Sequence, residues 1–393
     1  MRLSLTVLAV CCVGVGLFAA QQPQSPKLPE PFATPSVRNS SKIVPQPAGT
    51  TLKASAGFTV GVYADNLDRP RMMTLAPNGD IFVAQSAAGS VVILRDANKD
   101  GTPEARFTYA EGLRGVFGMA FHDGYLYLGR SDSLIRYKYT AGDTQAQGTP
   151  EKLADYPASG HSTRNILFSR DGRKMYVAVG SQSNKSAGEP KERAAINEYN
   201  PDGTGHRIFA SGLRNPVGLT LQPGTNTIWT AVNERDTLGD DLVPDYITSV
   251  KDGGFYGWPY SYIGSNYDPE HTGKEPDLVK RALVPDVLIP AHSAALGITF
   301  YTGTQFPPRY RNGAFVGLHG SWNRSKPQGY KVVFVPFQNG KPSGPPEDFV
   351  TGWTVKESPN EVWGRPVGVF VAPDGSLLVA DDAGSKIWRV RAN

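Results

Sequence analysis

The sequence is poor in cysteine. Among its 393 residues only Cys11 and Cys12 are cysteines, so the rest of the chain has no thiol. A disulfide framework or a Cys-x-x-Cys-His haem site would need cysteines in the folded part. Both are therefore excluded, and the folded part must be stable through its core alone.

An excess of charge of one sign is also absent. The 40 basic and 36 acidic residues leave a formal net charge of +4. This balance is too small to indicate a nucleic-acid partner, and no run of like charges suggests a membrane surface. Beyond residue 20, no apolar stretch approaches the length needed to span a bilayer.

The single long apolar run stands at the N-terminus. Arg2 precedes eighteen uncharged residues, Leu3 to Ala20, and the run ends in small residues. This pattern is typical of a secretory signal, so we expect residues 1–20 to be a signal peptide and the mature protein to be periplasmic or secreted. The alternative is an uncleaved membrane anchor, because the run is just long enough to span a bilayer. Residues 21–50, rich in Pro, Ser and Gln, are expected to form a flexible spacer.

From about residue 51 the chain consists of short apolar runs with period-two alternation, separated by Gly, Asn, Asp and Pro turns. The runs recur with a period of about 45–50 residues, which is typical of a β-propeller with four strands per blade. We therefore predict an all-β, six-bladed propeller over residues 51–393, with an insertion at about 233–290 where the spacing is longest. The turn glycines that mark the six repeats are Gly79, Gly124, Gly172, Gly224, Gly313 and Gly375.

The last repeat lacks a fourth strand. Residues 57–67 resemble the fourth strand of the other repeats, although no repeat precedes them. We expect this N-terminal strand to join the last blade and close the ring, which would leave no open sheet edge.

Basic side chains stand in the loops that precede the first strands of the repeats, and propeller topology would gather these loops at one mouth. Arginine binds carboxylates through two parallel hydrogen bonds and stacks on flat rings, so such a ring suits a small planar polyanion. For any single arginine, a structural ion pair at a blade junction is the alternative. The residues are Arg69, Arg71, Arg114, His161, Arg164, Arg214, His292 and Arg365.

Among them, His161 stands directly ahead of an inner strand in GHSTRNILF. An imidazole at that place could accept a proton near neutral pH, although a lone histidine is more often structural. The acidic loop NERDTLGDDLVPDY offers hard oxygen ligands that suit calcium, with a solvated loop as the alternative.

A second candidate metal loop spans residues 96–104. Asp96, Asn98, Asp100 and Gly101 match the start of an EF-hand loop. The twelfth position is Phe107 instead of the required glutamate, so a plain turn is the alternative.

Six segments, taken in order, resemble the soluble quinoprotein sugar dehydrogenases, and most closely their sorbosone dehydrogenase branch. They are GHSTRNILF, GLRNPVGL, NERDTLGDDLVPDY, GGFYGWP, HGSWNRSK and GRPVGVFVAPDG. The resemblance implies pyrroloquinoline quinone (PQQ) and Ca²⁺ as cofactors, and oxidation of an aldose or sugar aldehyde by hydride transfer to the quinone. Without a haem motif, the electrons would pass to an external acceptor such as a cytochrome c or a quinone.

The resemblance also implies roles for single residues. His161 matches the catalytic base, Arg214 and Asn215 match the pair that contacts the quinone and the reacting region, and Arg365 matches an arginine that binds a cofactor carboxylate. Where some relatives carry an acidic residue before the histidine, this chain has Gly160, so what orients His161 is left open. Further cofactor contacts are implied at Trp322, Asn323 and Arg324, and calcium ligands at Asp236, Thr237, Asp240 and Asp241.

Two other functions fit the fold. A calcium-dependent sugar lactonase would centre an acidic metal cage on the axis, whereas the axial residues expected here are mostly basic. A non-catalytic binding module would have lost the residues of the mouth, yet His161, Arg214 and Arg365 are all present. The sequence does not set the oligomeric state, with a monomer favoured.

Overall fold

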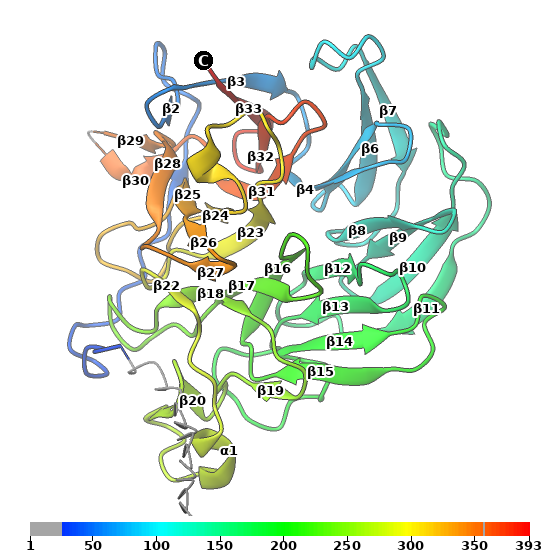
Figure 1. Cartoon of the computed structure of the whole chain (residues 1–393). Coiled ribbons are helices and arrows are strands. Elements are labelled where there is room, and N and C mark those ends of the chain that lie inside the picture. The colour runs from blue at the N-terminus through cyan, green and yellow to red at the C-terminus, as the bar shows by residue number, and fades with distance from the viewer. Residues whose placement is uncertain (1–25, 357) are drawn as a thin grey trace, which may run out of the picture.

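The computed structural model describes residues 26–356 and 358–393 (Figure 1), and the expected signal peptide lies outside them. Within these residues the chain forms strands, one short helix, α1 (Pro276–Lys280), and one 3₁₀ turn, Pro308–Tyr310. The predicted all-β class is confirmed. No helix in the described part is long and apolar enough to cross a membrane.

Six sheets of four or five strands follow one another along the chain. The first contains β4 (Pro70–Leu75), β5 (Ile81–Gln85), β6 (Ser90–Arg95) and β7 (Ala105–Ala110). The second contains β8 (Met119–His122), β9 (Tyr125–Gly129), β10 (Ser133–Lys138) and β11 (Glu151–Asp155). The third contains β12 (Arg164–Phe168), β13 (Met175–Val179), β14 (Ala195–Tyr199), β15 (Arg207–Ser211) and β19 (Gly254–Phe255).

The fourth sheet contains β16 (Asn215–Leu221), β17 (Ile228–Asn233), β18 (Asp245–Ser249) and β22 (Val287–Ile289). The fifth contains β23 (Ala295–Phe300), β24 (Ala314–Leu318), β25 (Lys331–Val335), β28 (Glu347–Thr351) and β2 (Lys53–Ala54). The sixth contains β31 (Pro366–Val371), β32 (Leu377–Asp381), β33 (Lys386–Ala392) and β3 (Phe58–Ala64).

Short strands complete the structure. One small sheet contains β1 (Lys42–Ile43), β29 (Thr354–Val355) and β30 (Ser358–Val362). Two hairpins contain β20 (Ser261–Tyr262) with β21 (Asn266–Tyr267), and β26 (Phe337–Gln338) with β27 (Lys341–Pro342). The expected insertion at about 233–290 therefore includes β18 and β22, two strands of the fourth sheet itself.

The sixth sheet combines β3, from near the N-terminus, with the last three strands of the chain. Strand β3 is hydrogen-bonded antiparallel to β33, in a register that runs from Phe58 opposite Ala392 to Ala64 opposite Ile387. The first strands β4, β8, β12, β16, β23 and β31 contact one another in this order, and β31 also contacts β4 (Figure 1). One apolar cluster joins Val83 and Leu94 of the first sheet to Leu378 and Ile387 of the sixth.

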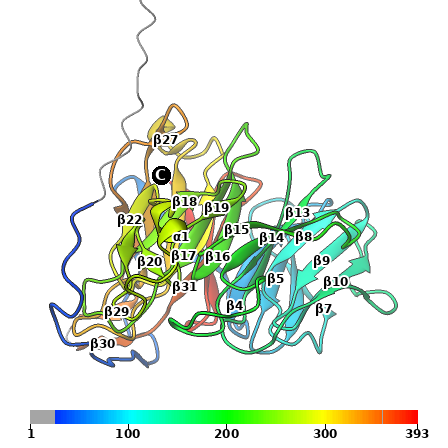
Figure 2. The ribbon, with the colours of Figure 1, turned by 90° about the horizontal axis from the view of Figure 1, so that it is seen from below.

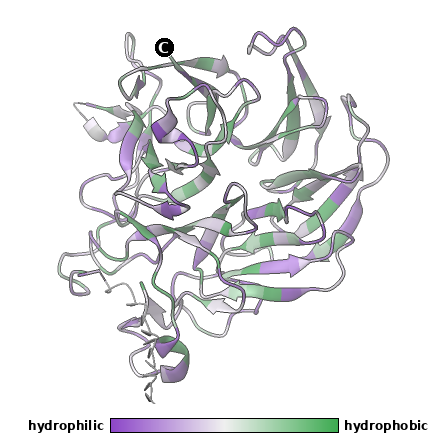
Figure 3. Ribbon diagram, in the orientation of Figure 1, coloured by the Kyte–Doolittle hydropathy of each residue, from purple (hydrophilic) through white to green (hydrophobic). Residues whose placement is uncertain are grey.

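Apolar residues follow the strands, and hydrophilic residues gather in the loops and in α1 (Figure 3). Where the first strands converge, Phe117, Val217, Leu296 and Val367 form one buried cluster, with Met72 packed against it. Full burial of such a side chain contributes about 1.5–3 kcal/mol. This cluster, which we call the axial plug, fills the centre between the first strands.

The first strands approach one another closely enough that their backbones touch. A Cβ atom added to Gly368 on β31 would lie 2.3 Å from the carbonyl oxygen of Arg71 on β4. A Cβ atom added to Gly297 on β23 would lie 2.5 Å from the carbonyl oxygen of Val367 on β31. Only glycine fits at these contacts, because the neighbouring atoms belong to rigid backbone.

The composition of residues 21–50 suggests a free spacer, yet the described residues 26–50, here called the N-terminal arm, lie against the body of the protein. Figure 2 shows the arm in dark blue along one side, beside β29 and β30. Lys42 and Ile43 pair with Glu361 and Val362 of β30. The arm is therefore anchored by backbone hydrogen bonds.

We predict that Gly368→Ala lowers the free energy of unfolding by about 1–3 kcal/mol, because the added methyl group must displace the backbone of β4. The matched control is Gly61→Ala in β3, where an added Cβ meets no atom within 4 Å. Urea denaturation followed by circular dichroism measures both. Equal stability of the two variants would contradict the close contact.

Candidate active site

His161 is held by the loop that follows β13. Its Nδ1 lies 2.8 Å from the carbonyl oxygen of Ser181, and its backbone N–H donates to the same oxygen at 3.0 Å. A carbonyl oxygen can only accept, so Nδ1 carries the ring hydrogen and Nε2 carries the lone pair. Ser181 thus takes the orienting role that an acidic residue at position 160 could have played.

The electrostatic surroundings keep this imidazole neutral. Burial, together with the positive charge of Arg214, lowers the pKa of His161 from 6.5 to about 3. Near neutral pH, Nε2 is therefore available as a proton acceptor.

Two buried arginines fix the backbone of the His161 loop. Arg164 donates from Nη1 to the carbonyl oxygen of His161 at 2.8 Å and to that of Thr163 at 2.7 Å. Arg193 donates to the carbonyl oxygen of His161 at 3.1 Å. Arg164 has a structural role of another kind than the ion pair expected as the alternative, since it positions the loop through backbone oxygens.

Arg214 is committed to a neighbouring loop. It donates to both oxygens of Asn184, from Nε to the carbonyl at 3.1 Å and from Nη2 to Oδ1 at 2.9 Å. It also donates to the carbonyl oxygen of Glu234 at 2.7 Å and to Asp236 at 3.3 Å. Beside it, Oδ1 of Asn215 is buried with no hydrogen-bond partner among the described residues. Arg214 therefore positions the 233–237 loop, while Oδ1 of Asn215 is a buried acceptor without a partner among the described residues.

A second histidine lies at the start of the 319–324 loop. Nε2 of His319 donates to the carboxylate of Asp382, with distances of 2.9 and 3.1 Å to its two oxygens. Burial lowers the pKa of His319 to about 4, so this histidine is also neutral near pH 7. Burial acts to raise the pKa of Asp382, but His319 and the arginines Arg71 and Arg365 outweigh it and lower this pKa to about 2.

Arg365 lies beside this pair. It donates to the carbonyl oxygens of His319 and Gly320, each at 2.9 Å. Its guanidinium also stands over the ring of Tyr330, with 5.7 Å from Cζ to the ring centroid. The residues matched to cofactor contacts thus lie on two sides of the site, with Arg214 near His161 and Arg365 near His319.

The four residues expected to bind calcium do not form one set of side-chain ligands, because each already has its own partner. Asp236 lies 3.3 Å from both Arg214 and His292. The backbone N–H of Thr237, a residue with φ 74°, donates to Asn323. The other two carboxylates turn to the 322–325 loop, Asp240 to Ser325 and Asp241 to Arg324.

The N-terminal arm connects these two loops. The backbone N–H of Asn39 donates to the carbonyl oxygen of Trp322 at 2.7 Å. Its side-chain amide donates to the carbonyl oxygen of Ser325 at 2.9 Å. Asn323 donates to the carbonyl oxygen of Val37 at 3.1 Å and accepts from Thr237 at 2.8 Å. Asn323, expected to bind cofactor, therefore joins the arm to both loops, while Arg324, also expected to bind cofactor, joins the two loops through Asp241. Trp322 remains 44% exposed.

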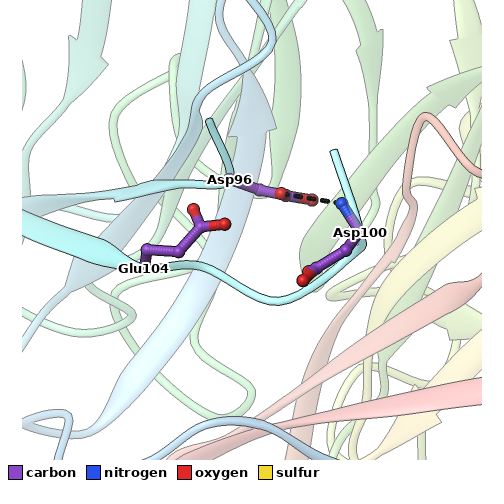
Figure 4. A group of neighbouring side chains, drawn as sticks. All are labelled: Asp96, Asp100 and Glu104. Carbon is purple, nitrogen blue, oxygen red and sulfur yellow. Dashed lines mark hydrogen bonds between the residues drawn. The ribbon is translucent and has the colours of Figure 1, made fainter. Parts of the chain in front are cut away.

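The second candidate metal loop does bring carboxylates together. Figure 4 shows Asp96, Asp100 and Glu104, whose ligand atoms lie within 4.8 Å of one another. Loop amides already bind two of them, since Gly101 and Asp100 donate to Asp96, and Ala97 donates to Glu104. A metal at residues 96–104 stays a prediction.

The site contains four residues of polar loops to which the sequence assigned no individual role. Ser181 and Asn184 stand in the SQSN segment, and His319 and Asp382 stand at the ends of strands. Their place in loops was a signal for all four, but the bonds that define their roles join separate loops, such as Ser181 to His161 and His319 to Asp382.

The described chain is thus an all-β protein of repeated sheets with a neutral histidine among arginines at one mouth. The model of the TrAA12-like family matches residues 52–248 and 263–393. The chain belongs to this family, and the resemblance to the soluble PQQ-dependent sugar dehydrogenases is confirmed.

Three relatives show how the sequence identity and the covered share of each protein vary. An uncharacterized protein of Borreliella burgdorferi is 30% identical over 369 residues, which is 90% of this chain and 94% of that protein. A pyrroloquinoline quinone-dependent pyranose dehydrogenase of Coprinopsis cinerea is 25% identical over 88% of this chain, which spans 55% of that protein. An aldose sugar dehydrogenase of Escherichia coli is 29% identical over 40% of this chain and 44% of that protein.

Solved structures share the fold. The holo PQQ domain of the Coprinopsis cinerea pyranose dehydrogenase superposes with a TM-score of 0.75 at 22% identity, covering 88% of this chain and 98% of that one. The calcium structure of a Trichoderma reesei family AA12 enzyme gives 0.75 at 20% identity, covering 94% and 100%.

We predict that His161 stays neutral in the folded protein from pH 8 down to about 4, with the hydrogen on Nδ1. Because its pKa of about 3 lies below the unfolded value near 6.5, its contribution to stability is complete above pH 6.5 and falls as the pH drops toward 3. Nitrogen NMR of the histidine rings, with His161→Gln for assignment, measures both properties. Titration of His161 near pH 6.5 would contradict this account.

We also predict that Asn39→Ala loosens the 322–325 loop, since it removes the side-chain bond to Ser325. Hydrogen exchange at residues 322–325 should accelerate about fivefold to tenfold, as expected for loss of one hydrogen bond of about 1 kcal/mol. Lys42→Ala, which removes only an exposed ion pair of the arm with Glu361, is the control and should leave this exchange unchanged. Equal exchange in the two variants would show that the arm does not brace the loop.

Proposed function

We propose that this chain is a PQQ-dependent dehydrogenase that oxidises an aldose or a sugar aldehyde of the sorbosone type. The observation that carries the proposal is a neutral His161 near Arg214, whose Nδ1 hydrogen is held by the carbonyl oxygen of Ser181, so that Nε2 keeps its lone pair. The named relatives, which are dehydrogenases of pyranose, glucose and aldose sugars, support the substrate class.

We further propose that the six sheets are the blades of a propeller and that β3 closes the ring. The pairing of β3 with β33 and the contact of β31 with β4 support this arrangement. Closure would bring the loops before the first strands to a single mouth above the axial plug.

The residues of the mouth fit a planar cofactor with several carboxylates. Guanidinium groups of Arg71 and Arg365 offer charge, and the buried Oδ1 of Asn215 and Nε of Arg71 offer an acceptor and a donor without partners among the described residues. When bound, PQQ would supply the two-electron acceptor that side chains lack. Arg365 would hold a cofactor carboxylate, and Asn215 would face the reacting region.

In this proposal His161 does the proton chemistry. Nε2 takes the proton of the sugar hydroxyl, while Ser181 holds the Nδ1 hydrogen and so fixes which nitrogen reacts. Arg214, through Asn184 and Asp236, keeps the neighbouring loop in place and disfavours a positive charge on His161 in the resting state.

Calcium is part of the proposal, with backbone oxygens near Asp236 and Thr237 as its ligands. The calcium structure of the Trichoderma reesei enzyme supports the ion. The carboxylates of Asp240 and Asp241 contribute less, because they already bind the 322–325 loop.

A signal peptide at residues 1–20 would place the enzyme in the periplasm or outside the cell, with an external cytochrome c or quinone as acceptor. The lactonase alternative requires an acidic metal cage on the axis. The axis carries instead the plug of Phe117, Val217, Leu296 and Val367, with arginines above it, which favours the dehydrogenase.

The test is to add PQQ and Ca²⁺ to the purified chain and measure dye reduction with aldoses and sugar aldehydes. We expect bound quinone absorbance and turnover of at least one substrate. Absence of both would reject the proposed function, and quinone binding without turnover would favour a binding module.

We predict that His161→Gln lowers kcat by about 10²–10⁴, the usual contribution of a general base, and leaves PQQ affinity within about twofold. His122→Gln is the control, since His122 stacks on Phe168 away from the mouth. If His161→Gln keeps its turnover, another group is the base.

A further inference from the structure

A long insertion joins two neighbouring strands of the fourth sheet. Strands β18 and β22 are antiparallel, with Asp245 opposite Ile289, so a turn of about two to five residues could join them. Residues 250–286 do so instead, and Figure 1 shows β20 and α1 of this insertion beyond the edge strand β19. Connections far longer than the turn requires are often functional. The contacts of the 250–286 insertion therefore bear on function.

The insertion crosses from the fourth sheet to the third. Its strand β19 pairs in parallel with β15 of the third sheet, and the backbone N–H of Trp258 then donates to the carbonyl oxygen of Gly212 at 3.1 Å. Between β13 and β14 the third sheet carries residues 181–185, here called the Ser181 loop, whose first residue holds Nδ1 of His161. The insertion thus reaches the loop that orients the proposed base.

Two buried side chains of the insertion bind the main chain of the Ser181 loop. Nε1 of Trp258 donates to the carbonyl oxygen of Asn184 at 3.0 Å. Nε2 of His271 lies 2.8 Å from the carbonyl oxygen of Lys185 and donates to it, because a carbonyl oxygen can only accept. Trp258 is 6% exposed and His271 is 7% exposed, so little water competes for these bonds. Together they fix the end of the Ser181 loop.

The middle of the Ser181 loop is held from the third sheet itself. The carboxylate of Glu189 accepts from the backbone N–H of Gln182 at 2.6 Å and from that of Ser183 at 2.7 Å. The insertion therefore adds its restraint at Asn184 and Lys185, which Glu189 does not hold.

Asn184 is the point at which the insertion meets the candidate active site. Its carbonyl oxygen accepts from Trp258 and also from Nε of Arg214, at 3.1 Å. Its Oδ1 accepts from Nη2 of Arg214 and from the backbone N–H of Asp236, each at 2.9 Å. The carbonyl oxygen of Arg214 in turn accepts from the backbone N–H of Ser181 at 2.7 Å. These bonds connect Trp258 to the residue that holds the proposed base.

A buried ion pair ties the same insertion to a second loop of the site. Nη1 of Arg235 donates to Oδ2 of Asp268 at 2.7 Å, and both side chains are 2% exposed. Nε of Arg235 donates to the carbonyl oxygen of Asp236 at 3.3 Å, one of the backbone oxygens proposed above for calcium. The backbone N–H of His271 closes the turn by donating to the carbonyl oxygen of Asp268 at 2.9 Å. The turn that carries His271 is therefore fixed relative to both loops.

We propose that Trp258 and His271 are positioning residues for the proposed reaction. They fix the end of the Ser181 loop, so that the carbonyl oxygen of Ser181 keeps its place against Nδ1 of His161 and Nε2 stays the nitrogen with the lone pair. Both act through the loop and not on the substrate. The assignment of proton transfer to His161 rests on the proposed function, whereas the hold on the loop needs no cofactor.

The first experiment uses the full chain without PQQ or Ca²⁺ and compares two variants that each lose one buried indole N–H. Trp258→Phe removes the donor to Asn184, and the control Trp229→Phe removes a donor to Gln222, 3.0 Å away beside a turn of the fourth sheet. Nitrogen NMR reports the tautomer of His161, and hydrogen exchange reports its backbone N–H.

The wild type and Trp229→Phe should carry the ring hydrogen of His161 on Nδ1 alone. Trp258→Phe should show about one tenth or more of the other tautomer and about threefold or faster exchange at His161, because the loop is released in part. Equal spectra and equal exchange in Trp258→Phe and Trp229→Phe would overturn the proposal.

The second experiment tests His271 by removal and rescue, and it carries the test alone if Trp258→Phe does not fold. His271→Leu removes the donor to Lys185 and should reproduce the change at His161, whereas His271→Gln keeps an N–H donor and should restore most of the wild-type behaviour. The same change in both variants, or a change in neither, would overturn the role of His271. Asp268 is left intact, because removing one partner of a buried ion pair leaves an unpaired buried charge.

The third experiment adds PQQ, Ca²⁺ and a sugar that the wild type oxidises. Trp258→Phe and His271→Leu should lower kcat about threefold to tenfold and leave KM within about twofold, since the base is misplaced while the sugar still binds. His271→Gln and Trp229→Phe should keep the wild-type kcat. A fall in kcat with an unchanged His161 would overturn the proposal, because the residues would then act by another route.

These results separate the positioning role from the proposed function. A wild type that binds no PQQ, with His161 altered in Trp258→Phe and His271→Leu, would keep the hold on the Ser181 loop and reject the dehydrogenase. A wild type that turns over with PQQ, with His161 and kcat unchanged in both variants, would keep the dehydrogenase and reject the positioning role.

Discussion

Backbone contact between the first strands of neighbouring sheets is the constraint on which the rest of the structure depends. At Gly297 and Gly368 there is no room for a Cβ atom, so the strands converge until the axial plug fills the space between them. The loops that lead into these strands must then end near one another. Residues as distant in sequence as Arg71, Thr163 and Asp382 line one cavity because the sheets that carry them converge on one centre.

Burial at this mouth decides the chemistry of its charged groups. His161 and His319 are both neutral near pH 7, each with one ring nitrogen fixed by an oxygen partner. The arginines keep their charge, so the mouth combines neutral proton acceptors with an excess of cations. That combination suits a polyanionic cofactor. The carbonyl oxygen of Ser181 explains why an acidic residue beside His161 is not required for its orientation.

Much of this architecture could be predicted from the sequence. The spacing of the turn glycines predicted six repeats, and the first two strands of each repeat lie in a separate sheet. The alternation in residues 57–67 predicted a strand, and this strand, β3, pairs with β33. His161 was identified from its place before an inner strand. Such features are local patterns repeated along the chain, which is why they can be read without a structure.

The roles of other residues depend on contacts between distant loops, and these left no local pattern. The expected cofactor contact of Asn323 stays a prediction, and the structure adds a bridge from Asn323 to Thr237 and Val37. The expected calcium contacts of Asp240 and Asp241 stay predictions as well, and both carboxylates bind the 322–325 loop. Composition suggested that residues 21–50 are free, yet Asn39 and Lys42 anchor the arm, because even a Pro-rich segment can satisfy its backbone on the edge of a sheet.

The central claim is that the mouth binds PQQ with its reacting carbon next to His161. A crystal structure of the chain with PQQ and Ca²⁺ tests it most directly. The account predicts the quinone above the axial plug, with its reacting carbonyl facing Nε2 of His161 and a carboxylate near Arg365. Quinone bound instead in the 630 Å³ cavity beside Tyr63 and Asp374, on the side of the turns, would contradict it.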